Sequence, residues 1–440
     1  MKTILLLLLV TLLTASPVLS QSQVDSSSLL QNATLENCIQ YALSHQPSVQ
    51  QSLINEQIAN KEINSSLSEW FPQLDLNFNV QHYFKLPTSI FQGNAVHFGQ
   101  INTSNGQFSI TQTIFNKDVL LASSTAGDVR KQAEQNTAEN KIKVVVNVSK
   151  AYYSVLLSQN QIDLVNQDIA RLRQNLKDAY NQYKGGVVDK TDYMQATVSL
   201  NNAEAELKQD QGQLKISYAN LKNQMGYPPN GDISLNYNMK KMEDEIGADT
   251  TAVLKYQDRI EYKLLQTQKR LQKANLDYYI WSFLPSLSAF GDYNLNYQND
   301  KLTNLYNRGF PNSYVGLQLS FPIFHGGQRI QQIEQAQLEL DLIKYDKSAL
   351  ESSISTEYTQ ALANYKSNLN NYRVQKNNLK LAKDVYNIIE LQYKSGIKTY
   401  LDVITAETNL RTTQVNFLNA LYQALLSKTD LQKALGSIHY

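Results

Sequence analysis

Residues 358–396 read YTQALANYKSNLNNYRVQKNNLKLAKDVYNIIELQYKSG. An aromatic or leucine side chain recurs at every seventh position, and Asn, Gln, Lys and Asp fill many of the positions between. Proline is absent and glycine occurs only at the end, although these two residues most often interrupt helices. The pattern predicts a long helix that packs lengthwise against other helices. The recurring residues are Tyr358, Tyr365, Tyr372, Leu379, Tyr386 and Tyr393.

A second part of the chain has the same form. Residues 88–227 and 323–440 contain no proline, and each region holds a heptad run, a glycine turn and a second run. The turns lie near 185–186 and 395–396. We therefore expect two antiparallel helical hairpins with helices on the order of 100 Å long. The other heptad positions are Val148, Val155, Ile162, Ile169, Leu176 and Tyr183, then Leu200, Leu207, Leu214 and Leu221, and, less regularly, Leu410, Phe417, Ala424 and Leu431.

The two hairpins are copies of one unit. Gly186 and Gly396 are 210 positions apart, and so are Asp192 and Asp402. A constant offset across about eighty positions indicates an internal duplication. We expect a first repeat at 21–226 and a second at 257–440. The segment between them, 227–256, interrupts the helical pattern and is the expected linker.

Each repeat also contains two segments in which apolar and polar residues alternate, which is the period of a strand with one apolar face. They lie at about 73–83 and 107–115 in the first repeat, and at about 286–297 and 314–323 in the second. Strands of roughly ten residues cross a bilayer when they are tilted. Gln112 and Phe290 break the alternation. The segments 84–106 and 298–313 are then expected to be outer loops.

Aromatic side chains gather near the ends of these strands, as they do at the interfaces of membrane β-barrels. The alternative is a soluble sheet with one face on a core, but the predicted helices run far beyond any sheet and offer no second layer. Four strands cannot close a barrel and lipid tolerates no open edge, so several copies must share one barrel. The candidate interface residues are Trp70, Phe71, Trp281 and Phe283.

The N-terminus and the composition restrict location and partners. Residues 1–20 contain one charged residue, Lys2, then an apolar run and a small residue at position 20, which is the pattern of a secretory signal peptide. The chain has 40 Lys+Arg and 39 Asp+Glu, and this balance argues against nucleic acid or an anionic membrane surface as the main partner. No later apolar run reaches the roughly 18 residues of a membrane-spanning helix, which excludes a helical inner-membrane protein.

Motifs for chemistry are missing from the sequence. The single cysteine, Cys38, excludes a disulfide framework and a cysteine-rich metal site. The five histidines have no metal-ligand spacing, and neither a nucleophile elbow nor a phosphate-binding loop occurs. We therefore predict no enzyme, no catalytic residue, no cofactor and no metal site.

Taken in their order along the sequence, the motifs resemble those of the TolC family of trimeric outer-membrane efflux channels, over essentially the whole mature chain. Residues 34–43, TLENCIQYAL, are similar to the family's opening helix, and residues 66–74, SLSEWFPQL, to its entry into the first strand. Residues 322–329, PIFHGGQR, are similar to its exit from the last strand. Residues 186–196 and 396–406 are similar to its two hairpin tips. The resemblance implies a mostly helical fold with a β-barrel part: a homotrimer with a twelve-stranded barrel, a twelve-helix periplasmic tunnel, and 227–256 as an equatorial belt.

The resemblance also implies a location and partners. The protein would lie in the outer membrane of a Gram-negative bacterium, in contact with its lipid, with a large periplasmic portion. The hairpin tips would dock to a periplasmic adaptor and to an inner-membrane pump of the RND or ABC type. The adaptor-contacting residues would be Gly185, Gly186, Val187, Ser395, Gly396 and Ile397.

Particular residues correspond to the family's periplasmic entrance. Asp402 corresponds to its acidic ring, and Thr405 stands where some members have a second acid. Tyr393 and Lys398 correspond to residues that hold the inner hairpin to Thr191 and Asp192 of the outer one. The alternative for Asp402 is a solvated carboxylate, or a charge that stabilises the N-terminus of its own helix.

Three functions remain open at this stage. The chain is expected to be a passive exit channel of a tripartite efflux or secretion system, carrying either small toxic molecules or exported proteins. A periplasmic coiled-coil adaptor or scaffold without a barrel is the alternative. An adaptor would have one hairpin flanked by β-domains, whereas this sequence predicts two hairpins and strands long enough to cross lipid.

Overall fold

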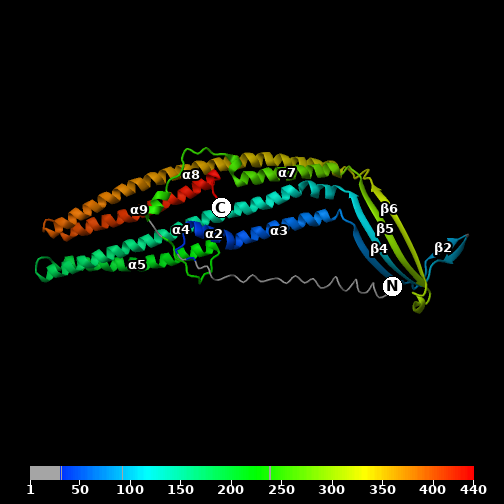
Figure 1. The fold of residues 1–440 in the computed structure, drawn as a ribbon, viewed down its shortest axis with the longest axis horizontal. Helices are drawn as coiled ribbons and strands as arrows, with labels where there is room; N and C mark the ends of the chain where they lie inside the picture. Colours follow the sequence, from blue (N-terminus) through cyan, green and yellow to red (C-terminus); the bar gives the residue numbers. More distant parts are fainter. Residues whose placement is uncertain (1–29, 31, 92, 237–238) are drawn as a thin grey trace.

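The computed structural model describes residues 30, 32–91, 93–236 and 239–440, so the predicted signal peptide at 1–20 lies outside the described residues. The protomer is elongated, with long helices along most of its length and a sheet at one end (Figure 1). None of the helices in the described part of the chain is long and apolar enough to span a bilayer.

Both predicted helical hairpins are confirmed. The first consists of α4 (Lys117–Lys184, 68 residues) and α5 (Lys190–Met225), and the second of α8 (Gln328–Lys394, 67 residues) and α9 (Tyr400–Leu435). At about 1.5 Å per residue, α4 and α8 are each about 100 Å long. The heptad positions Tyr365, Tyr372 and Tyr386 are buried, as their period predicts.

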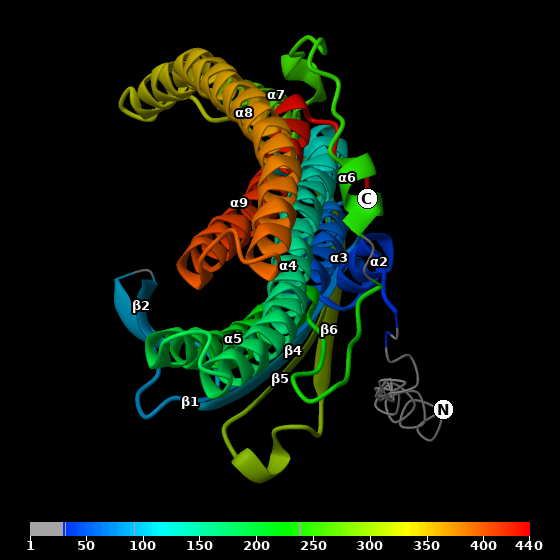
Figure 2. The ribbon, with the colours of Figure 1, turned by 90° about the vertical axis from the view of Figure 1, so that its left-hand side faces the viewer.

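Shorter helices continue each hairpin toward the sheet. After α2 (Leu35–His45), α3 (Pro47–Ser68) lies beside α4, and α7 (Ile260–Trp281) lies beside α8 (Figure 1). In the end view the helices follow a curved row, open on one side (Figure 2). A single protomer therefore forms part of a wall around a space.

The largest buried cluster lies at mid-length, where α2, α4, α5, α8, α9 and the linker meet. The linker segment contains α6 (Met239–Glu245) and a short 3-10 helix η1 (Tyr256–Asp258), and it is bound to the second hairpin. The Tyr365 hydroxyl donates to the Ile246 carbonyl at 2.9 Å, and Lys376 pairs with Glu243 at 2.5 Å. The linker is therefore packed against the helices and not a free connection.

The sheet has four antiparallel strands in the order β1-β4-β5-β6, so β1 and β6 are its edges. Their bounds are β1 Gln73–His82, β4 Asn102–Phe115, β5 Ser286–Asn299 and β6 Gly309–Ser320. A two-stranded hairpin of β2 (Thr88–Phe91) and β3 (Asn94–His97) lies between β1 and β4, and a 3-10 turn η2 (Leu302–Asn304) lies between β5 and β6.

Two of the predicted strand positions were wrong by several residues. β4 begins at Asn102, not near 107, because its ladder with β1 continues to the pair His82–Asn102. β6 covers 309–320 instead of 314–323, because Gly309 pairs with Tyr297 at one end. Backbone hydrogen bonds thus extend past the alternating segments, and the outer connections are shorter than the predicted 84–106 and 298–313.

The two faces of the sheet differ as the alternation predicts. On one face, Leu74, Ile110 and Val315 share one row and are exposed. On the other, carboxamides bond across strands: the distance from Asn105 Nδ2 to Asn296 Oδ1 is 2.6 Å, and from Asn294 Nδ2 to Asn312 Oδ1 2.9 Å. An apolar face toward lipid and a polar face toward a lumen are typical of membrane barrels.

One exception to the alternation has a structural reason. Phe290 lies on the polar face directly opposite Gly316. A Cβ atom at position 316 would lie only 2.7 Å from the Phe290 Cζ atom, so the ring covers the space left by the missing side chain. Nothing in the structure explains Gln112 on the apolar face.

The duplication extends to tertiary contacts. Each shorter hairpin helix ends at a glycine in the left-handed region, Gly226 at φ 66° and Gly436 at φ 72°. A Cβ at Gly226 would lie 2.7 Å from the His45 carbonyl oxygen, just before α3, and one at Gly436 would lie 3.1 Å from the Asp258 carbonyl oxygen, just before α7. In both repeats, therefore, a glycine joint holds the end of the shorter hairpin helix against the start of the helix that leads into the sheet.

This joint gives the first testable prediction. Gly226→Ala adds a backbone clash to left-handed strain and should lower the free energy of unfolding by roughly 3 kcal/mol. Gly186→Ala is the matched control, since Gly186 has φ 72° but open space around it, and it should cost only about 1 kcal/mol. Chemical denaturation of both variants measures the difference. Equal losses would show that the joint is not tightly packed.

Candidate functional site at the hairpin tips

The two hairpin tips are built alike. In the first, the Gly186 amide donates to the Tyr183 carbonyl at 3.0 Å, and in the second the Gly396 amide donates to the Tyr393 carbonyl at 2.9 Å. Gly186 and Gly396 both have positive φ, which lets the chain turn back after the helix. The residues that follow, Val187 and Ile397, are 75% and 72% exposed. Each tip therefore presents one apolar side chain on a fixed turn.

Asp402 has a local structural role at the second tip. Its Oδ2 atom accepts hydrogen bonds from the Thr399 amide at 3.0 Å and the Thr399 hydroxyl at 2.9 Å, and its own amide donates to Thr399 Oγ1. This reciprocal pair is a capping box for α9. The Thr399 amide and hydroxyl, aided by Lys398, lower the pKa of Asp402, so the carboxylate is ionised at neutral pH.

Tyr393, another predicted entrance residue, bonds to the end of α4 within one protomer. The Tyr393 hydroxyl donates to Gln182 Oε1 at 2.9 Å and not to Thr191 or Asp192, because the last turn of α4 lies within its reach. Burial raises the pKa of Tyr393, and the nearby Asp192 carboxylate adds to the rise. Tyr393 thus still joins the second hairpin to the first.

Lys398 and Thr405 act within the second hairpin. The Lys398 ammonium lies 3.6 Å from Asp402 one turn along the same segment, so this ion pair does not reach Thr191 or Asp192. The Thr405 hydroxyl donates to the Leu401 carbonyl at 2.8 Å and adds no charge. The structure therefore brings Lys398, Thr399 and Asp402 together, and separately Tyr393 and Gln182.

A buried charge cluster above the tips was missed by sequence reasoning. Asp168 and Arg171 on α4 meet Glu407 and Arg411 on α9, and Arg411 also pairs with Glu206 on α5. The Arg171 Nε atom lies 3.5 Å from Glu407 Oε1. The side chain of Asp168 is 2% exposed and that of Glu407 is 8% exposed. This cluster, Asp168, Arg171, Glu206, Glu407 and Arg411, ties both hairpins together.

Burial dominates the electrostatics of this cluster. Desolvation raises the pKa values of Asp168 and Glu407, although the arginines beside them favour the charged forms. One oxygen of each carboxylate, Asp168 Oδ2 and Glu407 Oε1, is buried without a hydrogen bond in the described residues. The cluster is therefore a contact between hairpins that is held by charge and only partly satisfied by hydrogen bonds.

The predicted interface aromatics lie where helix changes to strand. Trp70 and Phe71 lie between α3 and β1. Trp281 is the last residue of α7, and Phe283 lies between α7 and β5. Trp70, Phe71 and Phe283 are exposed, and the Arg329 guanidinium lies 5.3 Å from the Phe283 ring centre. All four therefore lie at the end of the sheet next to the helices, in connections that correspond between the two repeats.

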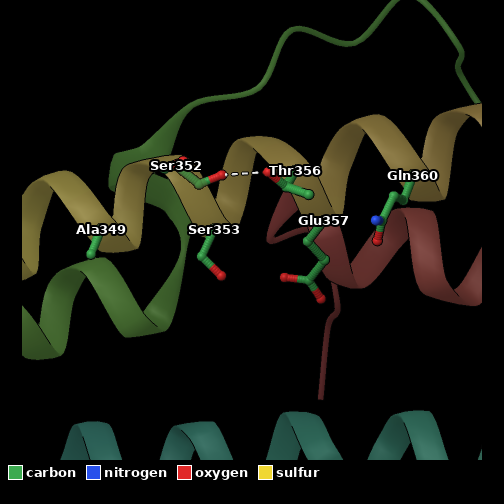
Figure 3. Close-up of a pocket in the computed structure, with 6 residues that line it drawn as sticks. All are labelled: Ala349, Ser352, Ser353, Thr356, Glu357 and Gln360. Atoms are coloured by element: carbon green, nitrogen blue, oxygen red, sulfur yellow. Dashed lines mark hydrogen bonds between the residues drawn. The ribbon is translucent and has the colours of Figure 1, made fainter.

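A surface depression lies along the second hairpin. One open depression of about 640 Å³ lies along α8 and is lined by Ala349, Ser352, Ser353, Thr356, Glu357 and Gln360 (Figure 3). Its single charged group, Glu357, already pairs with Arg259 at 2.7 Å and Lys433 at 2.9 Å. Glu357 therefore connects α8 to the start of α7 and to α9.

The charge cluster gives a prediction for pH dependence. A carboxyl group whose folded pKa is raised binds its proton more tightly in the folded state, so its contribution is most favourable at low pH and is lost as pH rises through the folded pKa. The pKa of Glu407 is raised from the ordinary value of 4.5, so Glu407→Gln should flatten the decline of the unfolding temperature as pH rises above 4.5. Thermal unfolding followed by circular dichroism measures this slope.

The matched control for this experiment is Glu204→Gln. Glu204 on α5 pairs with Arg173 on α4 at 2.8 Å, close to the cluster in sequence, but both side chains are largely exposed. We expect this control to keep the wild-type slope. A wild-type slope in Glu407→Gln as well would contradict a role for the buried carboxyl group.

Comparison with known proteins supports the fold and the family. The chain is 23% identical to the outer membrane protein TolC of Escherichia coli strain K12 over 434 residues, which cover 94% of this chain and 84% of the relative. It is 21% identical to TolC of Vibrio cholerae over 384 residues, covering 86% and 85% of the two chains. The crystal structure of the outer membrane protein VceC of Vibrio cholerae superposes with a TM-score of 0.72 at 16% identity, covering 91% of this chain and 96% of that one.

A family-level match covers most of the chain. The sequence matches the family described as "Outer membrane efflux protein" over residues 38–227 and 261–437, which include both hairpins and all four strands of the sheet. The chain therefore belongs to the outer membrane efflux protein family, whose members are outer-membrane exit channels with a large periplasmic part.

Proposed function

We propose that three copies of the chain form one closed barrel of twelve strands in the outer membrane. The observation that carries this proposal is the four-stranded sheet with an exposed apolar face and two free edges, β1 and β6. Unpaired backbone groups at such edges are costly in lipid. β1 runs away from the helices and β6 runs toward them, so β1 of one copy and β6 of the next are antiparallel partners.

The helices continue the barrel as a tunnel. In one protomer they form a curved row (Figure 2), and three such rows around one axis enclose a passage. This arrangement supports an exit channel over a periplasmic adaptor or scaffold, because a scaffold has no use for an apolar sheet face. The channel carries small molecules or exported proteins delivered from the periplasm.

The tips are the periplasmic end in this proposal. Val187 and Ile397, on the turns formed by Gly185, Gly186, Ser395 and Gly396, provide exposed apolar contacts for a periplasmic adaptor, which links the channel to an inner-membrane pump. Three Asp402 carboxylates near the axis form an acidic entrance that favours cations. The Tyr393–Gln182 bond connects the two hairpins of one copy beside that entrance, and the Asp192 carboxylate lies close enough to affect Tyr393.

Single-channel recording tests the entrance. Asp402→Asn removes the charge but keeps an oxygen that caps α9, so folding should be preserved. We expect the wild-type protein to form channels in planar lipid bilayers and to be blocked by divalent cations from the periplasmic side. The block should weaken about tenfold in Asp402→Asn, since losing a ring of carboxylates removes the attraction for cations.

The matched control is Asp189→Asn. Asp189 is the N-cap of α5 at the other tip, where its carboxylate accepts the Lys190 amide at 2.5 Å. We expect this variant to keep the wild-type block, because Asp402 and not Asp189 lies near the axis. Equal block in all three proteins would remove Asp402 from the pore, and a protein that forms no channels would contradict the proposed function itself.

A further inference from the structure

An apolar hairpin stands at the outer end of the sheet. β2 and β3 pair from Thr88–His97 to Phe91–Asn94, and two backbone bonds fix the base, from the Tyr83 amide to the Ile101 carbonyl at 2.7 Å and from the Phe98 amide to the Pro87 carbonyl at 3.1 Å. Figure 1 shows β2 clear of the four-stranded sheet. We call residues 84–101 the outer hairpin.

The outer hairpin exposes more apolar surface than a water-facing loop normally does. Phe84 is 98% exposed and Ile90 is 81% exposed. Within 84–101, Lys85 is the only Lys, Arg, Asp or Glu residue. Such a surface is stable when another apolar surface covers it. The exposed large apolar residues are Phe84, Ile90, Phe91, Val96 and Phe98.

The position of the outer hairpin indicates which surface covers it. The hairpin directly follows β1, which is an edge strand of the sheet. In the closed barrel proposed above, that edge meets β6 of the next copy. β6 begins at its outer end with Gly309, and the turn 300–308 comes just before it. The topology therefore brings the outer hairpin of one copy beside the turn 300–308 of its neighbour.

The turn 300–308 is anchored to its own sheet and also exposes apolar side chains. Leu305 is buried, and the ring of Tyr306 packs edge-on against Tyr297 with centroids 5.1 Å apart, so the turn is fixed to its own sheet. At the same time Leu302 is 64% exposed and Tyr306 is 56% exposed. A rigid turn with exposed apolar groups loses little conformational entropy when another surface packs on it.

We propose that the outer hairpin of each copy packs on the turn 300–308 of the next copy, at the outer end of the junction between β1 and β6. We call this contact the clasp. The partner surface is a second copy of this chain. The proposal rests on the trimeric barrel proposed above, and it adds a contact outside the membrane to the strand pairing within it.

Thiol cross-linking tests the clasp. In a Cys38→Ala background, Ile90→Cys and Leu302→Cys are combined in one chain, and membranes are treated with a flexible bifunctional maleimide. We expect most of the protein to run as covalent dimers and trimers on denaturing gels. Ile90→Cys combined with Val187→Cys at the opposite end is the control, and it should give monomers only.

The other outcomes overturn the clasp in distinguishable ways. A cross-link within one chain, seen as a monomer with both thiols consumed, would mean that the hairpin folds onto its own turn. Covalent dimers with Ile90→Cys alone would mean that hairpins meet one another. Trimers that form normally without any cross-link would overturn the clasp and leave the channel intact, whereas failure to form trimers would overturn the proposed function as well.

A second measurement does not depend on introduced cysteines. Ile90→Ser combined with Phe91→Ser removes two large exposed apolar groups from the outer hairpin. We expect the purified trimer to dissociate at a temperature several degrees lower than the wild type. Val187→Ser, which changes an equally exposed residue at the tip, should leave the dissociation temperature unchanged. An unchanged temperature in the hairpin variant would contradict the clasp.

Discussion

The pairing of backbone groups at the two sheet edges is the constraint on which the rest of the structure depends. The order β1-β4-β5-β6 leaves one row of backbone groups at β1 and another at β6. The apolar face carries Leu74, Leu76 and other exposed side chains, and in the proposed barrel this face meets lipid. In hydrocarbon an unpaired amide or carbonyl costs several kcal/mol, by general estimates for polar groups. A single copy therefore has no stable place in the membrane, and the proposed trimer follows from the geometry of the edges.

The internal duplication explains how one chain supplies the rest of the channel. Each repeat supplies two strands of the four-stranded sheet, a shorter helix and a hairpin. Both repeats use a glycine joint to hold the end of the hairpin against the start of their own shorter helix, α3 or α7. The linker 227–256 lies between the two repeats of the chain and is bonded to α8 and α9. The buried cluster around Asp168 and Glu407 holds the two hairpins together close to the tips. The glycine turns at the tips themselves are exposed.

The sequence predicted the long-range periodic features well and the side-chain contacts poorly. The heptad tyrosines from Tyr358 to Tyr393 identified α8, and the constant offset between Gly186 and Gly396 identified the repeat, because both can be read from spacings along the sequence. The starts of β4 and β6 were misplaced since hydrogen bonding continues beyond the apolar alternation. The Tyr393–Gln182 bond and the contact of Arg171 with Glu407 were not predicted, because they depend on how each helix is rotated about its own axis relative to its neighbour. The only signal for the charge cluster was the presence of Asp168 beside Ile169 and Arg411 beside Leu410, next to the heptad stripes.

In the proposed trimer, the sheet of one chain is stable in the membrane only when its edges are paired with those of other copies. Measuring the mass of the protein after extraction from membranes with mild detergent, by light scattering corrected for bound detergent, tests it directly. We expect a particle of three chains that cannot be washed from membranes with carbonate. A monomer that stays in solution without detergent would contradict it.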